Sequence, residues 1–242
     1  MSEIIPLEIK FDYAGAINTI FPALIKDEKE LILVDCGYPG FLPLIRAASL
    51  EKGVNLDDLT KAIITHHDFD HIGSLAALKR IYPGISVLSS QEEERYINGM
   101  EKSLRLQQAE AIYDKLPDDQ KAGAMSFHKM LEAIEKVSVD GLLKDGDCLP
   151  WCGGMEIVAT PGHMPGHISI YLKEHKTLIS GDALVVENNH LAIANPQYTL
   201  DLAEAKRSIG KLLNYDIERV ICYHGGVFAN NVKVSLEELI EI

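Results

Sequence analysis

The run Thr65–Gly73 (THHDFDHIG) constrains this chain more than any other feature. It follows an apolar strand pattern at Lys61–Thr65, and its glycine opens a helical pattern at Gly73–Tyr82. Three histidines and two aspartates fall within residues 66–71. Ionisable groups at this density would be poorly solvated at the end of a strand, whereas a divalent cation neutralises carboxylates and orders imidazoles. The run therefore predicts a metal site at a strand-to-helix junction.

The geometry of extended backbone separates the ligands of this run. Alternate side chains of a strand point the same way, so we expect His66, Asp68 and Asp70 to converge. His67 is expected to point elsewhere, and the bend into the helix is expected to turn His71 inward.

Three later stretches supply further ligands for such a site. Each places a histidine or aspartate just beyond a predicted strand, next to glycines that let the backbone turn sharply and approach an ion closely. The stretches are Thr160–His167 (TPGHMPGH), Ser180–Ala183 (SGDA) and Cys222–Gly226 (CYHGG). Other histidines lack ligand-like neighbours and are expected to be solvated; they are His128, His175 and His190.

Strand and helix patterns alternate along the chain, which predicts the α/β class. The expected strands are Leu31–Cys36, Lys61–Thr65, Ile85–Ser89, Met155–Thr160, Ile168–Leu172, Thr177–Ser180 and Arg219–Tyr223. The expected helices are Phe41–Lys52, Gly73–Tyr82, Asp201–Leu213 and Val234–Ile242. The segment from about 91 to 139 is almost free of strand patterns and is broken near Leu116–Asp119, which predicts an inserted helical pair. The insert is either a packing appendage or a lid over a substrate pocket.

In combination, the HxDxDH run, TPGHMPGH, SGDA and YHGG occur in the order seen in the metallo-β-lactamase superfamily, which the chain resembles from about Ile17 to Gly226. Asp35 in LILVDCG also resembles the early strand-ending aspartate of that family. The resemblance implies a four-layer αββα sandwich with its site at one edge, between the two sheets. It also implies one domain over residues 1–242, with the helical insert at about 91–139.

The same resemblance implies two divalent metal ions per chain. The ligands would be His66, Asp68 and His163 for the first metal, Asp70, His71 and His224 for the second, and Asp182 as a bridge between them. His167 would be part of the scaffold and Asp35 would support the ligands without binding metal.

The sequence departs from the commoner form of the motif at Asp68, where that form has a histidine. Either Asp68 is a carboxylate ligand or the first position is weakened. A carboxylate here resembles the di-iron branch of the superfamily, and harder oxygen ligands favour iron or manganese relative to zinc. Zinc is the expected metal, with iron and manganese as alternatives.

Hydrolysis is the expected reaction, because two metals can lower the pKa of a shared water toward 7 and polarise a substrate oxygen. A bridging hydroxide would attack, and Asp70 is the expected catalytic residue that orients it and later protonates the leaving group. A small ester, lactone or thioester suits the apolar insert. A phosphodiester would gain from lysines or arginines, which the motif loops lack. A β-lactam is a weaker alternative.

Two hypotheses lie outside hydrolysis. Asp68 leaves open a mononuclear or di-iron oxidoreductase resembling the persulfide dioxygenases. A protein that uses metal only for folding is the third hypothesis, although seven potential ligands exceed the needs of a closed four-coordinate site.

Charge and composition limit the partners. The net charge of −13 and the scattered lysines and arginines argue against nucleic acid. The chain shows no targeting pattern and no apolar run long enough to span a membrane, so a cytoplasmic protein without membrane contact is expected. Its four cysteines are expected to be reduced thiols. The expected partner is a small-molecule substrate, and a homodimer is left open.

Overall fold

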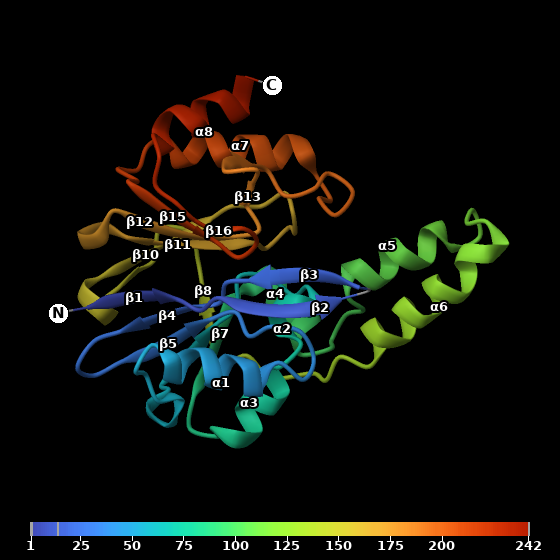
Figure 1. Ribbon diagram of the computed structural model, residues 1–242, viewed down its shortest axis with the longest axis horizontal. Helices are drawn as coiled ribbons and strands as arrows, with labels where there is room; N and C mark the ends of the chain where they lie inside the picture. The colour runs from blue at the N-terminus through green and yellow to red at the C-terminus, as the bar shows by residue number, and fades with distance from the viewer. Residues whose placement is uncertain (1, 14, 242) are drawn as a thin grey trace.

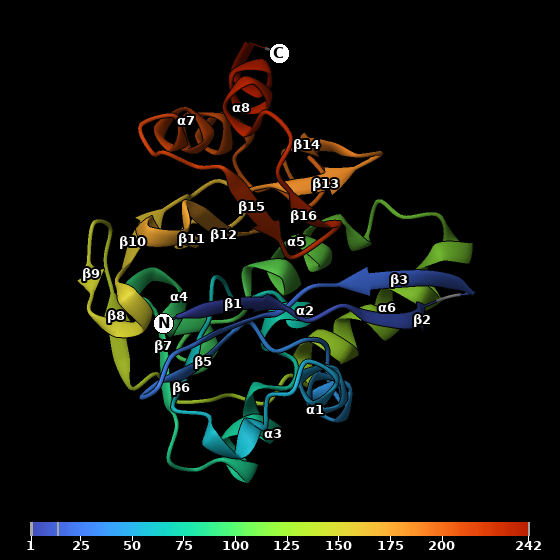
Figure 2. The ribbon, with the colours of Figure 1, turned by 60° about the vertical axis from the view of Figure 1, so that its left-hand side comes forward.

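Two β-sheets packed face to face, with helices on both outer surfaces, form the body of the protein (Figure 1). The structure is a computed structural model that describes residues 2–13 and 15–241. Helices α1 (Leu42–Glu51) and α3 (Leu75–Ile81) cover the first sheet, and α7 (Leu202–Leu212) and α8 (Val232–Glu241) cover the second (Figure 2). The α/β class and the four-layer αββα arrangement predicted from the sequence are confirmed.

The first sheet is built mainly by the N-terminal half of the chain. Its strands, in spatial order, are β1 (Glu3–Pro6), β4 (Ala23–Lys26), β5 (Leu31–Val34), β6 (Lys61–Ile63), β7 (Ser86–Ser90) and β8 (Gly141–Leu143). The pairs β1–β4 and β4–β5 are antiparallel, whereas β5 to β8 run parallel. The carboxyl ends of β5 and β6 therefore lie at the same edge of the sheet.

The second sheet comes from the C-terminal half. Its strands, in spatial order, are β16 (Gly226–Phe228), β15 (Arg219–Cys222), β12 (Thr177–Gly181), β11 (Ile168–Leu172), β10 (Met155–Ala159) and β9 (Cys148–Leu149). β12 and β15 are parallel, and β11 is antiparallel to both of its neighbours. β10, β12 and β15 consequently end at one edge.

Alternating burial along the strands builds the separate layers of the core. In β5, Leu33 packs with the cluster that contains helices α1 and α3, whereas Ile32 and Val34 pack with residues of the second sheet. All three are almost fully buried, and burying such a side chain contributes about 1.5–3 kcal/mol. The period of two along each strand thus joins helix to sheet on one face and sheet to sheet on the other.

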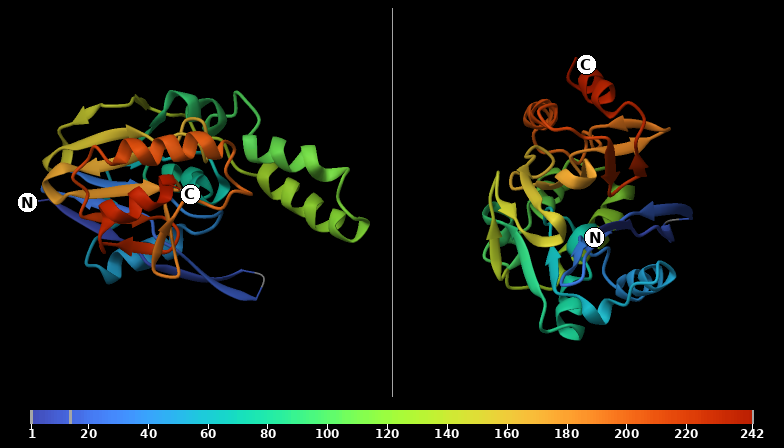
Figure 3. Two further views of the ribbon diagram at one scale, coloured as in Figure 1. Left: turned by 90° about the horizontal axis from the view of Figure 1, so that it is seen from above. Right: turned by 90° about the vertical axis from the view of Figure 1, so that its left-hand side faces the viewer.

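The segment at 91–139 forms the predicted helical pair and one additional helix. α4 (Gln91–Ile97) packs beside β7, while α5 (Leu104–Tyr113) and α6 (Asp118–Glu132) form a hairpin that projects from the sandwich (Figure 3). The break at Asp114–Pro117 falls where the sequence predicted it. Only the base of the hairpin lies against the body, and its outer face exposes Ile112 and Met125.

The remaining elements are short. Two hairpins, β2 (Ile9–Tyr13) with β3 (Ala16–Ile20) and β13 (Val185–Glu187) with β14 (His190–Ala192), lie outside the two large sheets. Helix α2 (Phe69–Ile72) is a single turn within the ligand run. Asp70 therefore lies on helical backbone, and the strand alternation expected to bring it together with His66 and Asp68 does not extend to it. Among the described residues, none of the helices has the length and apolar character needed to cross a membrane.

Candidate metal centre

The polar residues predicted from the motifs meet at one edge of the sandwich, because they follow strands that end there. The THHDFDHIG run comes after β6, and Asp35 follows β5. On the facing sheet, His163 follows β10, Asp182 follows β12 and His224 follows β15. The amide of Ile168 donates to the carbonyl of Thr65 at 3.1 Å, which joins the two sheets beside the site. All seven predicted ligands are brought together here.

One group of ligand atoms consists of His66, Asp68 and His163, whose donor atoms lie within 4.8 Å of one another. Asp68 Oδ2 is 3.1 Å from His163 Nε2 and 3.6 Å from His66 Nε2. All three residues are buried. This is the first set that the sequence predicted.

A second group consists of Asp70, His71 and His224, again within 4.8 Å. Asp70 Oδ2 lies 3.2 Å from His224 Nε2 and 3.8 Å from His71 Nε2. Asp182 lies between the two groups: one oxygen is 3.4 Å from His71 Nε2, and the other is 3.6 Å from His163 Nε2 and 3.5 Å from His224 Nε2. Its carboxylate is placed to be shared by cations held by both groups.

Several buried polar atoms of this edge have no hydrogen-bond partner among the described residues. They are Nε2 of His66, Nε2 of His71 and Oδ1 of Asp182. Buried polar atoms are normally satisfied, since leaving one unpaired costs about 1–3 kcal/mol. Imidazole nitrogens and carboxylate oxygens that face one another without protein partners fit divalent cations. The donor set therefore fits the metals that the resemblance implies.

In the metal-free protein, the carboxylates of the site and burial shift the pKa values of the ligand histidines. Desolvation disfavours charge on His71, but the carboxylates of Asp182 and Asp35 outweigh it and raise the His71 pKa well above its ordinary value. Desolvation acts likewise on His224, where Asp182 raises the pKa to about 10. For His66, desolvation and the neighbouring His71 lower the pKa well below its ordinary value. Without metal, these carboxylates hold protons on two of the histidines.

Residues behind the ligands fix their orientation. Asp35, 1% exposed, accepts hydrogen bonds from the Thr65 amide at 2.9 Å, the Thr65 hydroxyl at 2.8 Å and His71 Nδ1 at 2.9 Å. Because Nδ1 donates to Asp35, His71 Nε2 is the nitrogen that faces the site, and it is available to a cation once its own proton is lost. The buried hydroxyl of Tyr223 donates to the carbonyl of Asp70 at 2.5 Å.

His167 is used entirely within the scaffold. Its Nε2 accepts the amide hydrogen of Asp182 at 3.0 Å, and its Nδ1 lies 2.8 Å from the hydroxyl of Thr160. Both ring nitrogens are thus occupied by protein partners, which fits the scaffold role expected for His167. Its hydrogen bond positions the backbone of the shared carboxylate.

Arg105 is a residue of the site that the motifs did not indicate. It is 3% exposed, lies in the first turn of α5, and contacts both oxygens of Asp68, through Nε at 3.1 Å and Nη2 at 2.5 Å. The motif loops indeed contain no lysine or arginine, but the insert brings one to the site. No sequence signal could have found it, because Arg105 is 37 residues from Asp68 and is one arginine among many polar residues of a helical pattern.

Two expectations about the other histidines need adjustment. His128 was expected to be solvated, but it is 7% exposed and its ring lies 5.5 Å from that of Tyr113, because α5 and α6 pack against each other. His67 does point away from the other ligands, yet it is also buried: its ring stacks on Tyr96 and pairs with Glu93.

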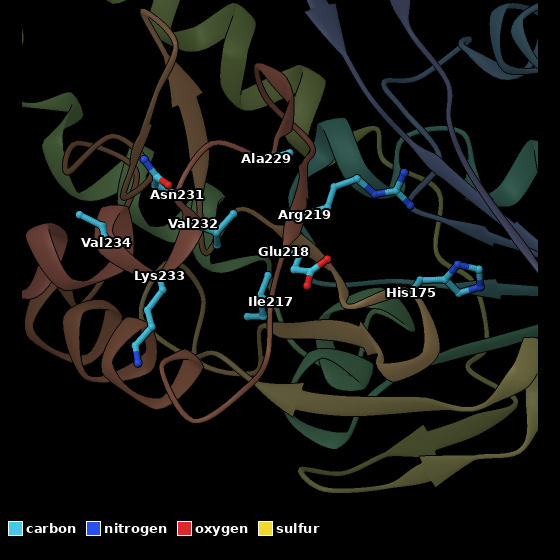
Figure 4. A pocket seen from close by; sticks show the side chains of 9 residues that line it. All are labelled: His175, Ile217, Glu218, Arg219, Ala229, Asn231, Val232, Lys233 and Val234. Atoms are coloured by element: carbon cyan, nitrogen blue, oxygen red, sulfur yellow. The ribbon is translucent and has the colours of Figure 1, made fainter.

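A shallow hollow of about 800 Å³ lies at the opposite end of β15 from His224. Figure 4 shows its lining side chains, with Arg219 and His175 on one side of the view and Lys233 on the other. None of the described candidate ligand groups lies there. Within the described ranges, the groups that could hold a metal therefore lie at the edge of the sandwich that carries Asp182.

Comparison with known proteins agrees with the fold. The family model of the metallo-beta-lactamase superfamily matches residues 20–224. The chain belongs to this superfamily.

Individual relatives have low sequence identity to this chain, but the matches extend over most of its length. The "Probable metallo-hydrolase YflN" of Bacillus subtilis is 27% identical over 240 residues, covering 92% of this chain and 86% of that protein. A hydroxyacylglutathione hydrolase of Brucella anthropi is 26% identical over 165 residues, covering 68% of this chain and 46% of that protein, so the match spans less than half of that enzyme. The metallo-beta-lactamase family protein TTHA1429 of Thermus thermophilus superposes with a TM-score of 0.76 at 23% identity, covering 98% of this chain and 78% of that one. This last similarity shows the fold.

Proposed function

We propose that this protein is a metal-dependent hydrolase that cleaves a small ester, lactone or thioester. The observation that supports this most strongly is the buried set of unpartnered ligand atoms around Asp182, which fits cations at two adjacent positions. The metallo-hydrolase relatives support the reaction class. The hydroxyacylglutathione hydrolases, whose name specifies an acyl derivative of glutathione, support an acyl substrate.

In this proposal, His66, Asp68 and His163 hold the first metal, and Asp70, His71 and His224 the second, with Asp182 shared. Bound divalent cations, zinc in our proposal, would polarise the substrate carbonyl and lower the pKa of a water toward 7. The protein fixes the ligand rings through hydrogen bonds behind them, as Asp35 does for His71. Burial of the ligands keeps bulk water from most of the site.

Asp70 is the residue that we propose for proton transfer. Its carboxylate faces His224, whose side chain is 34% exposed, so this side of the site is open to solvent and substrate. A carboxylate here can orient the attacking water, accept its proton and then donate that proton to the leaving group. The hydrogen bond from Tyr223 to the Asp70 carbonyl fixes the backbone at this point.

The experiment has two stages. Elemental analysis of protein purified without chelators measures the metal content, and a panel of esters, lactones and thioesters is then assayed before chelation, after chelation and after metal is restored. Turnover that is lost and recovered in step with metal supports the proposal. Iron accompanied by oxygen uptake with a thiol substrate would replace it with the oxidoreductase.

Asp70→Asn tests the proton-transfer role, because the amide cannot exchange the proton. We expect kcat to fall by about 10²–10⁴-fold, the usual contribution of general acid–base catalysis. Asp119→Asn is the matched control, since Asp119 is exposed on α6 in the insert. Asp70→Asn protein that retains its metal content and wild-type turnover would refute the role.

A further inference from the structure

We infer that Arg105 makes the two metal positions unequal: its guanidinium competes with the first metal for Asp68 and His163, so that zinc fills the second position before the first. This inference rests on the proposed metal site but not on the substrate. It assigns to the helical insert a function in setting the metal affinity of the centre.

The contacts of Arg105 use both oxygens of the first-position carboxylate. Nε and Nη2 donate to Asp68 in the two-pronged arrangement that is the strongest form of this ion pair. Nη2 also lies 3.5 Å from His163 Nε2, the nitrogen that faces Asp182. Two of the three residues expected to hold the first metal therefore already contact a fixed cation.

Further hydrogen bonds hold the Arg105 guanidinium in place beside Asp68. Nη1 donates to Gln108 Oε1 at 2.6 Å, and Nη2 donates to the carbonyl of Tyr198 at 2.9 Å, while the Tyr198 ring lies 5.4 Å from the guanidinium carbon. An arginine engaged on all sides has few donors left for a substrate. This favours a role toward the site itself over recognition of an anionic substrate.

The start of α5 is anchored directly beside the ligand run. The Leu104 amide donates to His67 Nε2 at 3.2 Å, so His67 must carry its proton on Nδ1, where it meets buried Glu93. Glu93 also accepts the amide hydrogens of His67 and of Gly166, both at 2.9 Å. One buried carboxylate thus links the insert, the ligand run and the loop that carries His163.

The second position has no such competitor. Among the described residues, no lysine or arginine forms an ion pair with Asp70 or Asp182. A divalent ion there directly meets carboxylates and imidazoles, and the charge of Arg105 acts on Asp70 and Asp182 only at longer range. An ion at the first position must share Asp68 with a guanidinium that stays charged at every working pH, and like charges this close repel.

The test is a zinc titration of metal-free protein in competition with a chelator of known affinity. Wild type is expected to show a tight and a weak step, and Asp68→Ala to lose the weak one. In Arg105→Gln, which is neutral but can still donate to Asp68, the weak step should tighten by about 10–100-fold, the usual reach of groups that contact metal ligands. The tight step should change much less, because Arg105 forms no ion pair with Asp70 or Asp182 and acts on them only at longer range.

Two further variants serve as controls, one for the charge of Arg105 and one for the loss of an arginine elsewhere in the chain. Arg105→Lys keeps the positive charge and should retain a weak first position. Arg95→Gln is the matched control, because Arg95 pairs with Glu101 on the surface, with a side chain 44% exposed, and should leave both steps as in wild type. Circular dichroism and urea unfolding of each variant establish that it is folded before the titration is interpreted.

Several outcomes would overturn the inference. Two equal steps in wild type would contradict it, and so would an unchanged weak step in Arg105→Gln. A weaker first step in Arg105→Gln would also contradict it, because it would mean that Arg105 holds Asp68 in place as a ligand. Protein that binds no zinc contradicts the proposed function as well. Unequal steps in a protein without hydrolytic turnover would refute only the proposed hydrolase.

Discussion

Replacing Asp35 tests whether the orientation of a metal ligand is set from behind it. Asp35 is buried at the end of β5 with a φ of 60°, a conformation that Asp and Asn adopt more readily than most residues. It accepts three hydrogen bonds, two from Thr65 and one from His71. Asp35→Asn preserves the shape and the backbone preference, whereas Asp35→Ala preserves neither.

The two variants should differ in stability. Asp35→Ala leaves the buried Thr65 amide and His71 Nδ1 without partners, and removing one side of a buried charged network costs about 3–5 kcal/mol. In Asp35→Asn the amide oxygen can still accept from the Thr65 amide, so the loss is one charge-assisted hydrogen bond, about 1.5–3 kcal/mol. Urea unfolding in the presence of a chelator measures both values.

Both variants should bind zinc more weakly, and for Asp35→Asn the reason is the tautomer of one ring. The new amide nitrogen would face His71 Nδ1, which would then have to accept a hydrogen bond and leave its proton on Nε2, the atom that faces the site. Zinc affinity at the second position should fall about 10–100-fold. Chelator competition measures it, with Asp119→Asn as control. Wild-type zinc affinity in Asp35→Asn would refute this reasoning.

Three further predictions concern the metal-free protein. Desolvation lowers the pKa of His167 to about 3, so between pH 6.5 and 3 the unfolded chain binds one more proton than the native one. His167 should therefore lower the free energy of unfolding by about 1.4 kcal/mol for each unit that the pH falls in this range. His167→Gln should show a shallower dependence of this free energy on pH in urea unfolding, and equal slopes in the variant and wild type would contradict this. Gly73→Ala should lower the free energy of unfolding by about 1–3 kcal/mol, because a Cβ there would lie 2.3 Å from the Pro39 nitrogen. Gly84→Ala should lower it by less than about 1 kcal/mol, because no described atom apart from its chain neighbours lies within 4 Å of such a Cβ. Similar losses in the two variants, measured by urea unfolding, would contradict the packing argument. Iodoacetamide at pH 8 should label exposed Cys148 and spare Cys222, whose pKa burial raises to about 12, until the protein is unfolded, as peptide mass spectrometry would show; early labelling of Cys222 would refute its protection.

The sequence alone was sufficient to predict the elements that carry the centre. Buried parallel strands appear as continuous apolar runs, so β5, β6, β12 and β15 were found within a few residues of their observed bounds. Ligands follow β6, β12 and β15 directly in the sequence, and His163 follows β10. Because parallel strands end at a common edge, local patterns were enough to predict that the ligands meet.

Strands whose pairing depends on distant partners were not predicted. β1 and β4 are four residues each, and β9 is two. Runs this short carry too little alternation to stand out. What makes them strands is the hydrogen bonding of a sheet edge that already exists, as in the register of Glu3 with Lys26.

The tertiary structure alone decided what surrounds Asp68. The sequence showed a carboxylate where a histidine is commoner, and left open whether it ligates metal or weakens the first position. The partner of that carboxylate, Arg105, lies on a helix of the insert, which the sequence predicted only as a packing appendage or a lid. Its guanidinium reaches the site because His67 and Glu93 anchor the start of α5. Contacts between segments so far apart in the chain are set by packing and loop closure, which no local pattern encodes.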